Sequence, residues 1–156
     1  MNSYRTLVLV ASLMLVLTGC QNRADYIRKN KDYLTTNKKQ QGVKVTPSGL
    51  QYKVLKAAKK GAKQPVLASV VTVHYEGRFV DGRIFDSSYK RKEPSQFPVT
   101  GVIRGWTEAL TLMKEGDIWE LTIPQDLAYG PSGRGPIPGF STLVFKVELI
   151  NTQNPK

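Results

Sequence analysis

Aromatic and apolar side chains close to predicted loops are the main chemical equipment of this sequence. They are Tyr75, Phe85, Phe97, Val102, Ile103, Trp106, Tyr129, Ile137 and Phe145. One carboxylate, Asp86, directly follows the second of them. Side chains of these types do not attack a substrate covalently, but they line apolar pockets that carry a few polar groups. The chemistry they indicate is binding, desolvation and hydrogen bonding.

The sequence offers little for nucleophilic or metal catalysis. His74 is the only histidine and Cys20 the only cysteine, so zinc-ligand spacings and a base for a serine nucleophile are both missing. The Gly/Pro segment 130–133 lacks the spacing of a nucleophile elbow and the flanking strand and helix of a phosphate-binding loop. We therefore expect no metal and no cofactor, and we interpret His74 as a structural strand residue.

Trp106 lies in the one convincing short helix of the sequence, which we expect over residues 101–113. Apolar residues recur there at i, i+3, i+4 and i+7, as on one face of an amphipathic helix: Trp106, Ala109, Leu110 and Met113. A lone tryptophan on such a face is usually a core residue. Its place in the first turn, after Val102 and Ile103, also favours the floor of an apolar pocket. Both interpretations remain open.

Period-two patterns before and after this helix predict strands. They cover residues 43–45, 50–54, 69–76, 119–123 and 142–150. An Asp81-Gly82 pair between apolar flanks predicts a tight hairpin, whereas residues 86–93 and 126–141 are predicted as loops. Strands on both sides of a single helix favour an α+β domain, with one antiparallel β-sheet half-wrapped around one short α-helix.

The N-terminus carries a targeting signal. Residues 1–19 have the pattern of a secretory signal peptide, with an apolar run at 7–17 that is too short to span a bilayer. The run ends in Leu17-Thr18-Gly19-Cys20, which resembles a bacterial lipobox. Acyl chains on Cys20 would anchor the mature protein in a membrane. Gln21, where an aspartate would indicate inner-membrane retention, favours the outer membrane by resemblance to Gram-negative lipoproteins.

The net charge of +11 is unevenly distributed. Residues 20–63 carry twelve Lys or Arg against two Asp, whereas residues 64–156 carry ten charges of each sign. An anchored, secreted chain seldom meets nucleic acid, so we expect the basic segment 22–63 to be attracted to anionic lipid headgroups. The alternative is a solvated, mobile tether. The apolar spacing between residues 22 and 41 also allows a short amphipathic helix.

Five blocks, in order and nearly at the family's spacing, resemble signature segments of FKBP-type peptidyl-prolyl isomerases. They are Val73-His74-Tyr75-Glu76-Gly77, Asp81-Gly82-Arg83-Ile84-Phe85-Asp86-Ser87-Ser88, Val102-Ile103-Arg104-Gly105-Trp106, Leu127-Ala128-Tyr129-Gly130 and Thr142-Leu143-Val144-Phe145. Residues 45–54 resemble the start of the catalytic domain in the bacterial macrophage-infectivity-potentiator branch. The resemblance implies a half-open antiparallel sheet around the helix, with a proline pocket between them.

The resemblance also implies a role for each pocket residue. The walls would be Tyr75, Phe85, Val102, Ile103 and Phe145. Trp106 would be the floor under the proline ring, and Tyr129 would donate a hydrogen bond to a carbonyl of the bound peptide. Asp86 would be the polar group at the edge, unless it only caps a turn. Ile137 would belong to an overhanging loop and Phe97 would support the wall.

The activity implied is cis-trans isomerisation of X-Pro bonds in envelope or secreted proteins, which assists their folding without a covalent intermediate. Inhibition by rapamycin- or tacrolimus-like compounds is expected. Ser95 departs from the family pattern, where an aromatic is usual, and the connections 97–102 and 129–145 are short. These departures leave open a non-catalytic proline-segment-binding module or chaperone lipoprotein. A structural spacer would explain the basic segment but not the pocket residues.

The sequence patterns and the family resemblance together predict four parts in the chain. We expect the lipoprotein signal at residues 1–19, a lipid-anchored basic stalk at 20–41, the isomerase domain at 42–151 and a short tail at 152–156. The long dimerising N-terminal helical domain of the infectivity-potentiator branch is mostly absent, so a monomer is expected.

Overall fold

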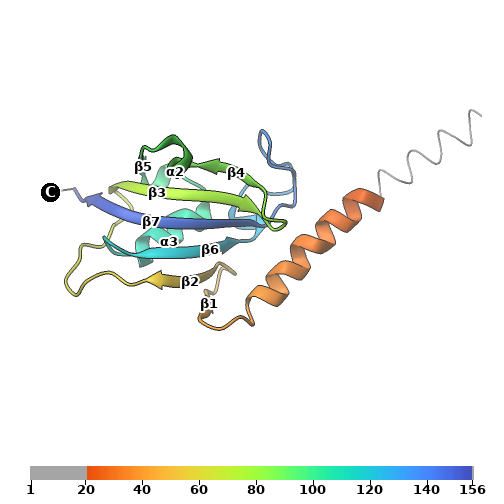
Figure 1. Cartoon of the computed structure of the whole chain (residues 1–156), viewed down its shortest axis with the longest axis horizontal. Coiled ribbons are helices and arrows are strands. Elements are labelled where there is room, and N and C mark those ends of the chain that lie inside the picture. The colour runs from red at the N-terminus through yellow and green to blue at the C-terminus, as the bar shows by residue number, and fades with distance from the viewer. Residues whose placement is uncertain (1–20, 156) are drawn as a thin grey trace, which may run out of the picture.

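A computed structural model describes residues 21–155, and their strands join into one antiparallel sheet (Figure 1). The strands are β1 (Val43–Val45), β2 (Gln51–Lys56), β3 (Val70–Phe79), β4 (Ile84–Ser87), β5 (Ser95–Pro98), β6 (Ile118–Ile123) and β7 (Leu143–Gln153). Their order is β1-β2-β6-β7-β3-β4, and β5 pairs with β3 off this path. The predicted α+β class and antiparallel sheet are confirmed.

Strands β3 and β7 form the centre of the sheet. They pair antiparallel from Val70 opposite Gln153 to Phe79 opposite Leu143. Inward residues alternate along both strands as predicted: Val71, Val73 and Tyr75 on β3, and Leu143, Phe145, Val147 and Leu149 on β7 are all buried. Since side chains of period two share one face, these residues form the side of the core on which the helix packs.

Helix α3 (Arg104–Leu112) packs against this apolar face. Its buried side chains are Trp106, Ala109 and Leu110. It begins three residues later than predicted, because Val99–Gly101 form a separate 3₁₀ turn, η1. A Cβ on Gly105 would lie 2.5 Å from Cγ2 of Ile123. Glycine there allows the helix to approach β6 closely.

Two short elements were not predicted. Helix α2 (Ser88–Arg91) occupies the charged segment, because the Ser87 hydroxyl accepts a hydrogen bond from the Lys90 N–H and caps it. Strand β5 follows and pairs with β3 from Val73 opposite Ser95 to Val70 opposite Pro98. In the β3–β4 hairpin, four residues separate the strands, and among them only Gly82 has a positive φ.

An N-terminal helix, described over residues 21–37, lies against the end of the sheet (Figure 1). The Asn37 side-chain amide donates to Gln51 Oε1 at 2.9 Å and to Thr122 Oγ1 at 3.2 Å, while Gln51 donates to the Leu34 carbonyl at 2.9 Å. Gln51 is therefore only 4% exposed, whereas Val54 of the same strand is 39% exposed. The helix thus covers β2 at its first residue, Gln51.

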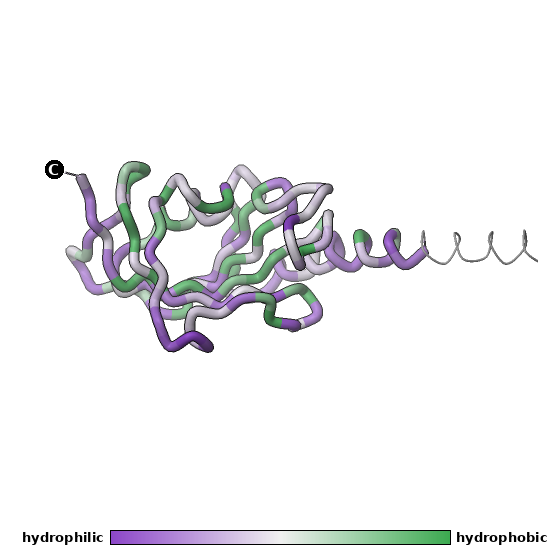
Figure 2. The backbone as a smooth tube through the Cα atoms, turned by 90° about the horizontal axis from the view of Figure 1, so that it is seen from above, coloured by the Kyte–Doolittle hydropathy of each residue, from purple (hydrophilic) through white to green (hydrophobic). Residues whose placement is uncertain are grey.

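The N-terminal part of this helix contacts the segment before β7. The Thr142 N–H donates to Asn30 Oδ1 at 2.7 Å, and the hydroxyls of Tyr26 and Ser141 are hydrogen-bonded at 2.6 Å. A freely solvated tether therefore does not describe this segment. Figure 2 shows that most residues of this helix are hydrophilic, with hydrophobic residues between them.

The predicted lipidation site and signal lie outside the described residues. Within residues 21–155 no helix combines the length and apolar character needed to cross a bilayer. The same part of the chain holds no cluster of three or more His, Cys, Asp or Glu side chains suited to a metal ion.

Candidate functional site

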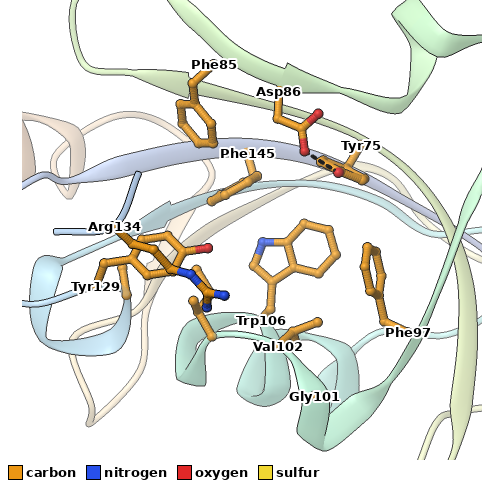
Figure 3. Close-up of a pocket in the computed structure, with 12 residues that line it drawn as sticks. Tyr75, Phe85, Asp86, Phe97, Gly101, Val102, Trp106, Tyr129, Arg134 and Phe145 are labelled. Carbon is orange, nitrogen blue, oxygen red and sulfur yellow. Dashed lines mark hydrogen bonds between the residues drawn. The ribbon is translucent and has the colours of Figure 1, made fainter. Parts of the chain in front are cut away.

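A cavity of about 480 Å³ opens between α3 and the sheet (Figure 3). Its lining residues are Tyr75, Phe85, Asp86, Phe97, Gly101, Val102, Ile103, Trp106, Ala128, Tyr129, Arg134 and Phe145. Strands β3, β4, β5 and β7 supply its aromatic walls, and α3 supplies the indole between them. Such a volume accommodates a small cyclic side chain together with the peptide groups beside it.

The Trp106 indole is fixed by three rings that meet it nearly at right angles. The ring centroids of Tyr75 and Phe145 each lie 5.3 Å from it and that of Phe97 lies 6.0 Å away, with interplanar angles of 86°, 85° and 86°. Edge-to-face contacts of this kind are favourable and restrict rotation. Trp106 is only 4% exposed and also lines the cavity, so it is both a core residue and a pocket residue.

The indole N–H has no hydrogen-bond partner within the described residues, although it is buried. An unpartnered buried donor costs free energy.

A polar corner faces these rings. The Tyr75 hydroxyl donates to Oδ2 of Asp86, and the Arg91 guanidinium pairs with Oδ1 of the same carboxylate. Arg91 also donates to the Tyr75 hydroxyl at 3.0 Å and lies over its ring, 5.7 Å from the centroid. Asp86 is thus held by side chains of β3 and α2, while Ser87 provides the helix cap.

These contacts determine the protonation of the corner. Burial alone would raise the pKa of the Asp86 carboxyl, but hydrogen bonds from Tyr75 and Arg91 and the Arg91 charge lower it below its ordinary value. Burial, followed by the hydrogen bond to Asp86, raises the pKa of the Tyr75 hydroxyl. At neutral pH the carboxylate is therefore charged and the phenol remains a neutral donor.

The segment after β6 forms the opposite rim. Tyr129 follows the 3₁₀ turn η2 (Gln125–Leu127), lines the cavity and is half-buried. Its hydroxyl makes no hydrogen bond within residues 21–155. An adjoining cavity of about 340 Å³ is lined by Phe85, Asp86, Tyr129, Arg134, Gly135, Pro136 and Ile137. The two hollows therefore share part of this rim.

Most side chains that the sequence singled out lie together. Nine line the larger cavity: Tyr75, Phe85, Asp86, Phe97, Val102, Ile103, Trp106, Tyr129 and Phe145. Ile137 lies only in the adjoining hollow and is 7% exposed. Lipidation at Cys20 concerns a residue outside the described range.

His74 has a structural environment. Its Nδ1 is hydrogen-bonded to the Ser88 hydroxyl at 2.9 Å, and its ring stacks on Tyr89 at 4.7 Å.

Sequence reasoning missed four residues of the site. Gly101, Ala128 and Arg134 line the cavity, and Arg91 holds its carboxylate. Arg91 carried no signal, because its segment was predicted as a surface loop. The loop after Tyr129 is short, but its sequence pattern does not indicate which side chain faces the pocket.

Two protein-family descriptions match this chain. The description "FKBP-type peptidyl-prolyl cis-trans isomerase" matches residues 61–150. The description "Domain amino terminal to FKBP-type peptidyl-prolyl isomerase" matches residues 18–54, which include the described N-terminal helix.

Curated relatives carry related names. The chain is 51% identical over 144 residues to the FKBP-type 22 kDa peptidyl-prolyl cis-trans isomerase of Escherichia coli (strain K12), covering 86% of this chain and 69% of that protein. It is 51% identical over 126 residues to the peptidyl-prolyl cis-trans isomerase Mip of Coxiella burnetii, covering 80% and 54%. It is 49% identical over 126 residues to the outer membrane protein MIP of Legionella longbeachae, covering 80% and 53%. The chain thus spans about half the length of the latter two.

Solved structures agree with the fold. The crystal structure of FkpA from Escherichia coli superposes with a TM-score of 0.80 at 39% identity, covering 98% of this chain and 73% of that chain. A peptidyl-prolyl cis-trans isomerase from Pseudomonas syringae gives a TM-score of 0.76 at 36% identity, covering 83% and 95%.

Proposed function

This chain belongs to the FKBP-type peptidyl-prolyl cis-trans isomerases, and we propose that it turns X-Pro bonds of envelope or secreted proteins in the cavity above Trp106. Relatives named as isomerases at 51% identity favour catalysis over a non-catalytic proline-binding module. The observation that carries the assignment of the site is the indole enclosed by three perpendicular rings. It is an apolar floor suited to the flat face of a proline ring.

The reaction needs no nucleophile. Rotation about an X-Pro bond is opposed by amide resonance, with a barrier of roughly 18–20 kcal/mol. The planar amide is more charge-separated than the twisted one, so an apolar pocket favours the twisted form. Each 1.4 kcal/mol or so of such preference increases the rate about tenfold. Phe85, Phe145 and Trp106 provide this environment.

Two polar elements complete the proposed mechanism. Tyr129 presents a hydroxyl without a partner in the described chain, and it donates to a carbonyl of the bound peptide. At the opposite edge, Asp86 is held charged by Arg91 and Tyr75, so its field is preorganised before substrate arrives. Phe97, Val102 and Ile103 complete the wall, and Ile137 shapes the overhang.

We also propose a lipid-anchored location in the cell envelope. The lipobox-like segment ending at Cys20 supports acylation, and one relative bears the name outer membrane protein MIP. The helix contacts the domain from Arg23 onward, only three residues beyond Cys20. An anchor there holds the domain close to the bilayer, where the basic segment 22–63 meets anionic headgroups. The protein acts as a monomer in this proposal.

A protease-free isomerisation assay on a Leu-Pro or Phe-Pro peptide tests the function, with and without rapamycin. We expect acceleration that rapamycin inhibits and that Trp106→Leu and Tyr129→Phe strongly reduce. Rapamycin binding without any acceleration would reject catalysis and favour the proline-binding module. Labelling with a clickable palmitate analogue tests the anchor, because Cys20→Ser should abolish incorporation.

A further inference from the structure

Arg134 occupies a shared border of the two hollows. It lines the cavity of about 480 Å³ and the adjoining one of about 340 Å³. Phe85, Asp86 and Tyr129 are likewise common to both. Figure 3 shows the Arg134 side chain pointing from the side of Tyr129 toward the middle of the pocket. A peptide with its proline above Trp106 therefore passes this guanidinium with a neighbouring residue.

The charge of Arg134 has no partner within residues 21–155, unlike that of the other arginines described there. Four of these are in ion pairs with carboxylates: Arg28, Arg78, Arg83 and Arg91. Arg104 donates to the Asp126 carbonyl, and Arg23 lies over the Phe140 ring. Because Arg91 already compensates Asp86, the mouth of the pocket carries one uncompensated positive charge, at Arg134.

The backbone holds this arginine in place. Arg134 and Ile137 exchange two backbone hydrogen bonds, of 2.9 and 3.0 Å, which close a tight turn. Gly133 has φ +71°, and a Cβ there would lie 2.2 Å from the Ile137 carbonyl oxygen. A side chain other than hydrogen is therefore excluded at Gly133. The guanidinium extends from a defined backbone position on the rim.

We infer that Arg134 is a specificity-determining residue, which makes this isomerase prefer prolines that have an acidic residue directly beside them in the peptide. The inference rests on the proposed function. Consecutive residues of an extended peptide are about 3.3–3.6 Å apart, so a flanking side chain reaches the adjoining hollow while the ring stays in the larger one. A planar guanidinium binds carboxylates with paired, charge-assisted hydrogen bonds. Polypeptides with Glu-Pro, Asp-Pro, Pro-Glu or Pro-Asp segments are thus the favoured substrates.

The test compares matched peptides on the protein expressed from its full sequence and purified in mild detergent. Two series carry Glu, Gln or Lys directly before or directly after a single proline, and exchange rates are measured by protease-free NMR. We expect kcat/KM to be about two- to fivefold higher for Glu than for Gln in at least one series, the range of a partly exposed ion pair. The preference should shrink as salt shortens the Debye length.

Three variants distinguish an effect of Arg134 on substrate preference from an effect of the protein's overall charge. Arg134→Gln should bring the Glu-to-Gln ratio to about one, and Arg134→Glu should make Lys the preferred neighbour. Arg83→Gln removes the same charge from the exposed β3–β4 hairpin, where it pairs with Asp81, and should leave the ratio unchanged. Because the readout is a ratio, partial unfolding lowers both rates alike.

Equal rates for Glu and Gln in both series, or a ratio that persists in Arg134→Gln, would overturn the inference while leaving the isomerase standing. Absence of acceleration for every peptide would instead overturn the proposed function, and this inference with it.

Discussion

The Thr142 N–H donates to the Asn30 side chain at 2.7 Å, and the Thr142 hydroxyl donates to the Asn30 carbonyl at 3.2 Å. Asn30 is only 2% exposed and also donates to the Tyr26 carbonyl at 2.8 Å. Thr142 ends the loop that carries Tyr129 and immediately precedes β7. The N-terminal helix is thus bonded directly to the end of the loop that forms the pocket rim.

Replacement of Asn30 by alanine should destabilise the protein by about 1–3 kcal/mol, because it leaves the buried Thr142 N–H without an acceptor. Urea unfolding, followed by tryptophan fluorescence, measures the change. Asn22→Ala makes the same substitution at an exposed position of the helix and should stay within about 0.5 kcal/mol of the parent. Equal stability of the two variants would show that the helix contact contributes nothing.

Gly77→Ala should disturb two pocket walls at once. A Cβ at this position would lie 2.6 Å from Cζ of Phe85 and 2.7 Å from Cε1 of Phe145. Both rings must then shift, and overpacking of this kind typically costs about 1–3 kcal/mol. We expect a higher KM for a proline peptide together with a lower unfolding midpoint. Adding Phe85→Leu makes room for the methyl group and should recover part of the stability; no recovery would contradict the steric explanation.

Asp86→Asn should lower kcat/KM for a neutral proline peptide several-fold, because the preorganised charge at the pocket edge is lost. The matched control is Asp81→Asn. Asp81 is likewise paired with an arginine, Arg83, and its pKa is likewise lowered, first by the Arg83 backbone N–H, but it lies outside the pocket lining. The Asp81→Asn variant should have the same kcat/KM as the parent. Equal rates in both variants would assign Asp86 a purely structural role.

The lowered pKa of the Asp86 carboxyl also determines how the protein responds to acid. Because the pKa of Asp86 is lowered in the fold, its stabilising contribution is fully present above the ordinary carboxyl pKa, about 3.9, and is lost as the pH falls through the lowered value. Isomerisation by the parent should therefore be insensitive to Asp86 titration between about pH 5 and neutrality. A loss of rate near pH 5 that is absent in Asp86→Asn would contradict this.

Much of the fold follows from period-two and helical patterns. The alternation on β3 and β7 and the apolar face around Trp106 are local signals, and the structure has both. Strand β5 and helix α2 were missed, because each is four residues long and depends on pairing with β3 or on a single serine cap. Short elements of this kind are determined by tertiary contacts more than by their own sequence.

The pocket was predictable from residue types in the signature blocks, whereas its polar supports were not. Arg91 reaches Asp86 only because α2 turns the chain back toward β3. Burial of Gln51 depends on Asn37, which is distant in sequence and lies in a segment that reads as a polar stalk. Such contacts leave no periodic trace in the sequence.

The Tyr89 hydroxyl should lose its proton only at an unusually high pH. Burial, followed by its hydrogen bond to Glu148 at 3.0 Å, raises the pKa of the Tyr89 hydroxyl to about 12. A raised pKa means that its stabilising contribution is fully present below the ordinary tyrosine value of about 10 and is lost as the pH rises toward 12. The pKa of Tyr75 is raised as well, so titration of phenolate absorbance should show late-ionising tyrosines, and Tyr89→Phe should remove one of them.

Glu148→Gln separates the two causes of this shift. It removes the negative charge beside the hydroxyl but leaves the ring stacked on His74 at 4.7 Å. The pKa of Tyr89 should fall, yet remain above the ordinary value, because burial is the larger cause. The stability difference between the parent and Tyr89→Phe, measured by urea unfolding, should narrow above about pH 10. If the parent and Glu148→Gln titrate identically, the Glu148 carboxylate does not hold the proton on Tyr89, and burial together with the charge of Glu76 accounts for the shift.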